Sequence, residues 1–117
     1  MFEFKINNRS WTIEEKSQSE IKKMQNERRA NEEENVKALD TRYYGITYCD
    51  IQKIYIDKDL PTDRKKSTLI HELSHCYIDN YITHCDKQYV EEDVADIVSN
   101  SYDIITEIIN KYFNTKE

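Results

Sequence analysis

Glycine and proline are almost absent from this chain, which has one residue of each among its 117. A phosphate-binding loop needs several closely spaced glycines so that the backbone can approach the phosphates. The sequence therefore excludes a loop of that kind. The single glycine, Gly45, indicates a bulge or a close backbone approach, or is simply a turn residue.

Cysteine is also scarce, with Cys49, Cys76 and Cys85 as the three residues and no C-x-x-C pair among them. An odd number without paired spacing favours free thiols in a reducing compartment over a disulfide framework. The N-terminal stretch lacks the apolar run of a signal peptide, and no segment is apolar enough to predict a membrane helix. These features predict a cytoplasmic protein with no membrane partner.

Basic residues are outnumbered, with 17 lysines and arginines against 23 acidic residues and a net charge of −6. Nucleic acids and anionic membranes attract basic surfaces, so direct binding to nucleic acid is not expected. The chain length predicts one domain over residues 1–117, with a modest core.

The hydrophobic pattern predicts an α+β fold. Alternating apolar residues predict strands, and apolar residues at helical spacing predict helices with one buried face. A turn is expected at Asn7-Asn8, and Thr62 or Asp63 is expected to cap the helix that follows Pro61. The expected elements, in a short antiparallel sheet packed on two helices, are a hairpin over 2–14, strands near 43–48 and 52–57, and helices over about 62–81 and 90–113.

Residues 15–40 are strongly polar and carry few apolar side chains. Ile21 and Met24 have helical spacing, which predicts a helix docked at its ends and solvated in the middle. Partial disorder over 26–35 is the alternative. The charged run is expected to be a solvated face, with a protein-docking surface as the functional alternative.

The most informative motif is His71-Glu72-Leu73-Ser74-His75. Two histidines four residues apart lie on one face of a helix, where both rings can bind a single tetrahedral zinc ion. Glu72 projects from the edge of that face, where it can accept a proton from an attacking water and return it to a leaving amine. The H-E-x-x-H pattern is typical of zinc proteases. It predicts His71 and His75 as ligands and Glu72 as the general base.

A catalytic zinc ion needs a third protein ligand and one open position. Glu92 on the last helix is the preferred candidate, and Asp96, one turn later, could accept the free N–H of a zinc-bound histidine. The small residues Ala95 and Ser99 would let the two helices approach closely. Glu91 is the alternative to Glu92.

Two other interpretations give the motif a different role. His84 and Cys85 could complete a closed structural zinc site with the two motif histidines, but Glu72 would then have no role. The histidines could also be ordinary surface residues that only form hydrogen bonds. Catalysis by Cys76 is disfavoured, because neighbouring helical residues such as His75 and Cys76 point about 100° apart.

The run "YGITYCDIQKIYIDKDL…STLIHELSHCYI…VEEDVADIVS" resembles the ImmA/IrrE family of small gluzincin metallopeptidases, which is common in bacteria, phages and mobile elements. A strand ending in "IYID", a helix with "TLIHELSH" and a helix with E-x-x-A-D follow in the same order. The resemblance implies a zincin-like fold and one Zn²⁺ per chain, with His71, His75 and Glu92 as ligands and Glu72 as base. Cys76 departs from the alanine that is common there, and residues 15–40 match least well.

The resemblance also implies a substrate. Family members typically cleave a DNA-binding transcriptional repressor, and gluzincin substrates commonly lie antiparallel to an edge strand, here expected to be 52–57. The alternative is a non-cleaving anti-repressor or toxin–antitoxin module on the same scaffold, docking through residues 15–40.

Overall fold

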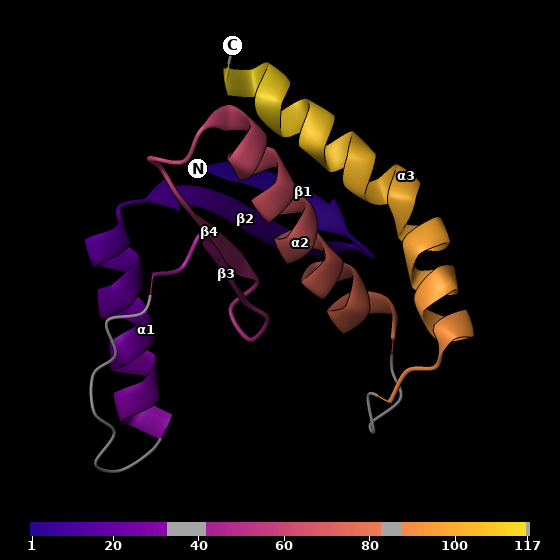
Figure 1. Cartoon of the computed structure of the whole chain (residues 1–117), viewed down its shortest axis with the longest axis horizontal. Coiled ribbons are helices and arrows are strands. Elements are labelled where there is room, and N and C mark those ends of the chain that lie inside the picture. The colour runs from indigo at the N-terminus through magenta and orange to yellow at the C-terminus, as the bar shows by residue number, and fades with distance from the viewer. Residues whose placement is uncertain (33–41, 83–87, 117) are drawn as a thin grey trace.

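The computed structural model describes residues 1–32, 42–82 and 88–116, which form a small domain of three helices and a four-stranded sheet (Figure 1). The predicted α+β class is confirmed. The predicted strands and the two predicted long helices are present with shifts of a few residues at their ends. The elements are β1 (Phe2–Ile6), β2 (Arg9–Lys16), α1 (Gln18–Glu32), β3 (Gly45–Tyr48), β4 (Lys53–Asp57), α2 (Thr62–Tyr81) and α3 (Glu91–Lys116).

The sheet has the strand order β1-β2-β4-β3, and its central pair is parallel. The β1–β2 and β3–β4 pairs are antiparallel hairpins. The predicted all-antiparallel sheet is therefore wrong at one junction, because the chain leaves β2 through α1 and returns with β4 beside β2. As a result β4 lies inside the sheet, and the two edges are β1 and β3, not the 52–57 strand.

The first hairpin turns at Asn7 and Asn8, as the sequence predicted. Their φ angles are 50° and 64°, so both residues have the left-handed backbone. A two-residue turn with positive φ at both positions matches the twist of the strands it joins. Asparagine tolerates this conformation better than most residues, which explains how the turn forms without glycine.

The main core lies between the sheet and the two long helices. Ile54 and Ile56 of β4 are fully buried there against Leu69 and Leu73 of α2, while Tyr55, on the other side of β4, belongs to a second cluster. This matches the predicted alternation along the strand. The main core consists of Phe4, Ile6, Trp11, Ile13, Ile54, Ile56, Leu60, Leu69, Leu73, Cys76, Tyr77, Ile105, Ile108, Ile109 and Tyr112.

Three apolar residues of the two long helices are exposed. Ile70 of α2, and Val94 and Val98 of α3, keep between 44% and 62% of their surface accessible. Ile70 follows Leu69 directly, so it projects about 100° away from the buried face of α2. The two valines lie where α3 has passed beyond the sheet.

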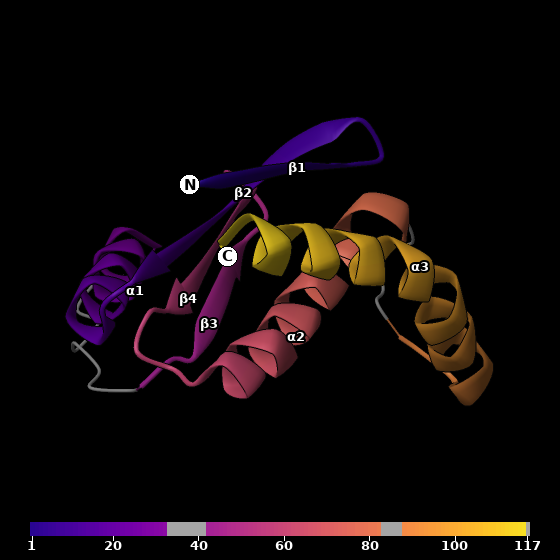
Figure 2. The same ribbon diagram turned by 90° about the horizontal axis from the view of Figure 1, so that it is seen from above.

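The polar N-terminal segment forms α1, which packs on the other face of the sheet from α2 and α3 (Figure 2). Ile21 is fully buried and joins a small cluster with Tyr48 and Tyr55. The helix prediction for residues 15–40 is confirmed over 18–32, whereas Glu15 and Lys16 belong to β2. Residues 33–40 of the predicted segment lie outside the described residues.

Asp57 ends β4 and is completely buried. Its carboxylate accepts hydrogen bonds from Gln18 Nε2 at 2.8 Å, the Asp59 backbone N–H at 2.9 Å and the Arg42 guanidinium at 3.4 Å. Burial opposes ionisation, but these donors outweigh it and hold the pKa of Asp57 below its ordinary value. The group fixes α1 and the chain leading into α2 to the end of β4.

The capping of α2 and the end of α3 differ from the prediction. Pro61 occupies the N-cap position of α2 and no side chain caps the helix, so the predicted cap by Thr62 or Asp63 is wrong. The predicted bounds of α2 are confirmed, and α3 runs three residues further than expected, to Lys116.

Among the described residues, no helix is long and apolar enough to cross a membrane.

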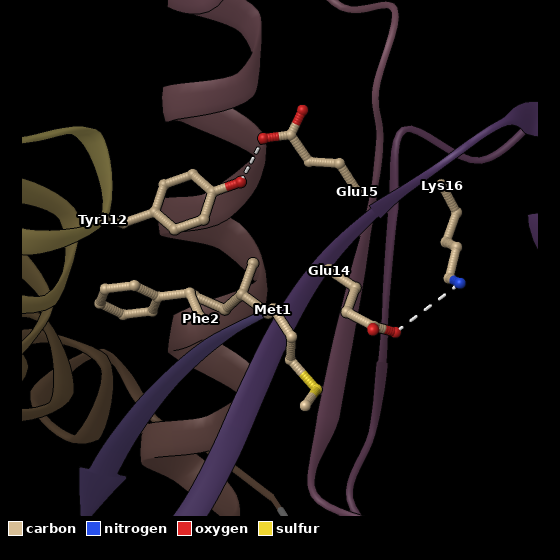
Figure 3. Close-up of a pocket in the computed structure, with 7 residues that line it drawn as sticks. Met1, Phe2, Glu14, Glu15, Lys16 and Tyr112 are labelled. Atoms are coloured by element: carbon tan, nitrogen blue, oxygen red, sulfur yellow. Dashed lines mark hydrogen bonds and ion pairs between the residues drawn. The ribbon is translucent and has the colours of Figure 1, made fainter. Parts of the chain in front are cut away.

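A polar contact fixes the C-terminal end of α3 to the sheet and to α2. Figure 3 shows the Tyr112 hydroxyl directed at the Glu15 carboxylate, to which it donates a hydrogen bond. Lys65 of α2 reaches the same carboxylate, with 2.8 Å between Nζ and Oε1. Burial raises the pKa of Tyr112, so its hydroxyl remains a donor at neutral pH. The adjoining cavity, lined by Met1, Phe2, Ile13, Glu14, Glu15, Lys16 and Tyr112, contains neither motif histidine.

Candidate metal centre

His71 and His75 lie on the exposed face of α2 with their rings turned toward each other. Their Nε2 atoms are 3.3 Å apart and the ring centroids 4.9 Å apart. Two nitrogens bound to one tetrahedral zinc ion at ~2.05 Å would stand about 3.3 Å apart. The spacing therefore suits two ligands of one metal ion. It also suits a single N–H···N hydrogen bond, which is the ordinary role that the sequence left open.

Glu72 lies beside the histidines but is buried, with 6% of its surface exposed. It follows His71 directly and projects about 100° around the helix, toward β3. There its Oε1 accepts a hydrogen bond from Thr47 Oγ1 at 2.7 Å. The cavity that holds these groups, here called the histidine cavity, is lined by Gly45, Ile46, Thr47, Cys49, His71, Glu72, His75, Ile78 and Asp79 and has a volume of about 490 Å³.

Gly45 allows β3 to lie directly against α2 at this point. A Cβ atom there would be 2.7 Å from Thr68 Cγ2 and 3.1 Å from Glu72 Cγ. Its φ is not positive, so the position requires glycine for space and not for backbone conformation. Of the roles the sequence suggested for this residue, the close backbone approach is confirmed.

The residues proposed from the last helix do not join this group. Glu92 and Asp96 are exposed on α3, and Asp96 lines a different cavity with Tyr77 and Ile82. Within residues 1–32, 42–82 and 88–116, no three His, Cys, Asp or Glu side chains are close enough to hold a metal ion.

Glu92 and Asp96 lie away from the histidines because α3 packs on a different face of α2. Leu73 and Tyr77, two and six residues after His71, lie about 200–240° around the helix from it. These two residues belong to the core that contains the buried residues of α3. A helix packed on that face is on the other side of α2 from the histidines. Ala95 and Ser99, expected to permit a close approach, are exposed, as is Glu91.

The two interpretations that involve cysteine have different outcomes. His84 and Cys85 lie outside the described residues, so the closed structural zinc site stays a prediction. Cys76 is fully buried in the main core. Burial raises the pKa of its thiol, and the negative charges of neighbouring acidic groups act in the same direction. A protonated, inaccessible thiol agrees with the inference that Cys76 is not a nucleophile.

The structure adds residues that the sequence did not single out. Asp79 lines the histidine cavity. It follows His75 by four residues, so helical spacing could have identified it. Thr47 had no comparable signal, because its role depends on the packing of β3 against α2.

Comparison with the models of known protein families, with curated proteins and with solved structures finds no match for this chain. The resemblance to the gluzincin family therefore rests on the motif residues and on their order along the sequence.

Proposed function

We propose that this protein is a zinc-dependent endopeptidase with a zincin-like fold, which hydrolyses a peptide bond in a protein substrate. The observation that carries the proposal is the pair of Nε2 atoms of His71 and His75, 3.3 Å apart, beside the buried carboxylate of Glu72. Metal ligands must be close together and accessible, and a general base must lie next to them without being one of them.

His71 and His75 would hold the zinc ion. A bound zinc ion lowers the pKa of water toward neutrality and polarises a substrate carbonyl. Glu92 is the third ligand that the family resemblance suggests, although it is exposed on α3. Asp79, which lines the histidine cavity, is its competitor.

Glu72 would take a proton from water and donate it to the amine that leaves the cleaved peptide. The Thr47 hydroxyl fixes one carboxylate oxygen, which restricts the directions in which the other can accept that proton. Burial beneath β3 keeps the carboxylate away from competing solvent contacts.

The substrate segment would lie along β3. This strand is one of the two edges of the sheet, and Gly45, Ile46 and Thr47 line the histidine cavity. An extended peptide can add to such an edge through backbone hydrogen bonds, which would set its carbonyls beside Glu72. The family resemblance suggests a DNA-binding repressor, and such a basic protein suits a chain with net charge −6.

A second candidate is a binding module that sequesters the same partner without cutting it. It is favoured by one observation: among the described residues, no three His, Cys, Asp or Glu side chains are grouped so that they could hold a metal ion. Such a protein would keep the scaffold and would not depend on Glu72.

The test compares wild type with Glu72→Gln in two respects. One is zinc content, and the other is cleavage of a candidate DNA-binding repressor, with the products identified by mass spectrometry. The proposal expects one zinc per chain in both proteins and loss of cleavage by about 10²–10⁴-fold in the variant, the usual contribution of a general base. Equal binding of zinc and repressor with no cleavage by either protein would favour the binding module. Unfolding of a Cys85→Ser variant with loss of zinc would favour the structural site.

A further inference from the structure

The outer side of β1 is the second edge of the sheet, at the opposite end from β3 and the histidine cavity. In Figure 2 β1 is the outermost strand. Among the described residues, no segment forms backbone hydrogen bonds with this side of β1. The edge can therefore accept a further strand.

The pairing of the first hairpin shows which backbone groups face this edge. In an antiparallel pair, residues that exchange backbone hydrogen bonds alternate with residues that do not. Glu3 lies opposite Thr12, whose N–H donates to the Gln52 carbonyl on the β4 side of β2, with an N···O distance of 3.2 Å. Glu3 is therefore in a pair without hydrogen bonds, and so is Lys5, two residues later. The N–H and C=O groups of both residues point outward, away from β2.

The side chains of the same two residues are the only charged groups of β1. Both are exposed, and they alternate with Phe2, Phe4 and Ile6, which pack in or against the main core. Opposite charges that face each other across two strands stabilise the pair, and like charges destabilise it. The charges on β1 therefore oppose pairing with most strands and favour one that carries the opposite charges in register.

We propose that β1 pairs with β1 of a second copy of this chain, antiparallel and with Phe4 on the two-fold axis. In this register Glu3 of each copy lies opposite Lys5 of the other, and their outward N–H and C=O groups can bond to each other. A slip by one residue would oppose outward-facing to inward-facing backbone groups. A slip by two residues would set Glu3 against Glu3, or Lys5 against Lys5.

The same register extends the apolar face across the two copies. It sets Phe4 opposite Phe4 and Phe2 opposite Ile6, beside a cavity of about 260 Å³ that β1 and α3 line together. The other edge lacks this self-complementarity, because β3 (Gly45–Tyr48) carries no charged residue. An interface of one short strand per copy is small, so the dimer should be weak and dependent on concentration. The proposal does not rest on the peptidase function.

The test measures self-association of the full chain by sedimentation over a wide range of concentration. Salt at about 0.15 M screens the repulsion between two copies of net charge −6. Glu3→Lys and Lys5→Glu each set like charges across the interface. A mixture of these two variants restores opposite charges, and so does the double variant Glu3→Lys/Lys5→Glu. The matched controls, Glu27→Lys and Lys23→Glu, change the net charge by the same amounts at exposed positions of α1.

The wild type should form a dimer in which the backbone N–H groups of Glu3 and Lys5 gain protection from hydrogen exchange. Each single β1 variant should dimerise about tenfold or more weakly. The mixture, the double variant and the α1 controls should associate like wild type, and circular dichroism verifies that each variant is folded.

A wild type that stays monomeric at every concentration would overturn the proposal and leave the β1 edge to an extended segment of another protein. Single β1 variants that associate as strongly as wild type would also overturn it, as would a mixture that stays monomeric. The same conclusion follows from a dimer in which both N–H groups stay unprotected, or from α1 controls that weaken association equally.

Discussion

The hydroxyl of Thr47 donates a hydrogen bond to the carboxylate of Glu72 across the contact between β3 and α2, with 2.7 Å between Oγ1 and Oε1. Glu72 has several rotatable bonds, and this contact selects one arrangement of its carboxylate. Because Thr47 lies on the edge strand, the base is positioned by the strand proposed to hold the substrate.

Replacing Thr47 by valine should lower kcat by about tenfold, the value of one neutral-to-charged hydrogen bond. Zinc content and KM should stay unchanged, because the side chain orients the base without binding metal or substrate. Thr47→Ser is the control and should keep most of the activity, since it keeps the hydroxyl. Loss of zinc in Thr47→Val, or equal activity in both variants, would contradict an orienting role.

Gly45→Ala should destabilise the fold by about 1–3 kcal/mol, the usual cost of overpacking. The new methyl would lie 2.7 Å from Thr68 Cγ2 and 3.1 Å from Glu72 Cγ. Urea unfolding measures the change. Thr68→Ser removes the nearer contact, so the double variant Gly45→Ala/Thr68→Ser should lose less stability than the sum of the two single variants. Strict additivity would mean that the two residues are not in conflict.

Asp57→Asn should lower the free energy of unfolding at pH 7 by about 1–3 kcal/mol, because the buried carboxylate accepts several hydrogen bonds there. The folded-state pKa is depressed, so the stabilisation is present above the unfolded pKa, near 3.8, and is lost as the pH falls through the lower folded value. Wild type and variant should therefore converge in urea unfolding below that range. A difference that stays constant down to pH 2 would assign the effect to packing. Asp63→Asn on the surface is the control.

The third zinc ligand can be assigned by titrating zinc against a chromophoric chelator. If Glu92 is the ligand, Glu92→Ala should weaken zinc binding by at least about tenfold, while Asp79→Ala should change it little. The reverse result would assign Asp79. Both side chains are outside the main core, so neither change should alter the thermal unfolding midpoint by more than a few degrees. His75→Ala is the positive control and should abolish binding.

The sequence predicted the local elements well, because their signals are local. The apolar spacing from Leu69 to Tyr77 fixed the span of α2, and the Asn7-Asn8 pair fixed the first turn. The convergence of His71 and His75 follows from helical geometry once α2 exists.

The parts that were not predicted depend on contacts between distant segments. Nothing in β2 or β4 alone specifies that they pair in parallel, because that choice depends on where α1 lies. Val94 and Val98 have the spacing of core residues, and only the position of α2 relative to α3 shows that they are uncovered. For the same reason a motif spacing could not establish whether Glu92 reaches the histidines.

All the residues lining the histidine cavity come from one uninterrupted part of the chain, between Gly45 and Asp79. Genetic recombination that carries this block intact would transfer the histidines, Glu72 and Thr47 together. The first hairpin, α1 and α3 would have to supply a core for it, but their outer surfaces could change independently. Divergence among proteins built this way should therefore concentrate on those outer surfaces, where side chains can change without altering the histidine cavity.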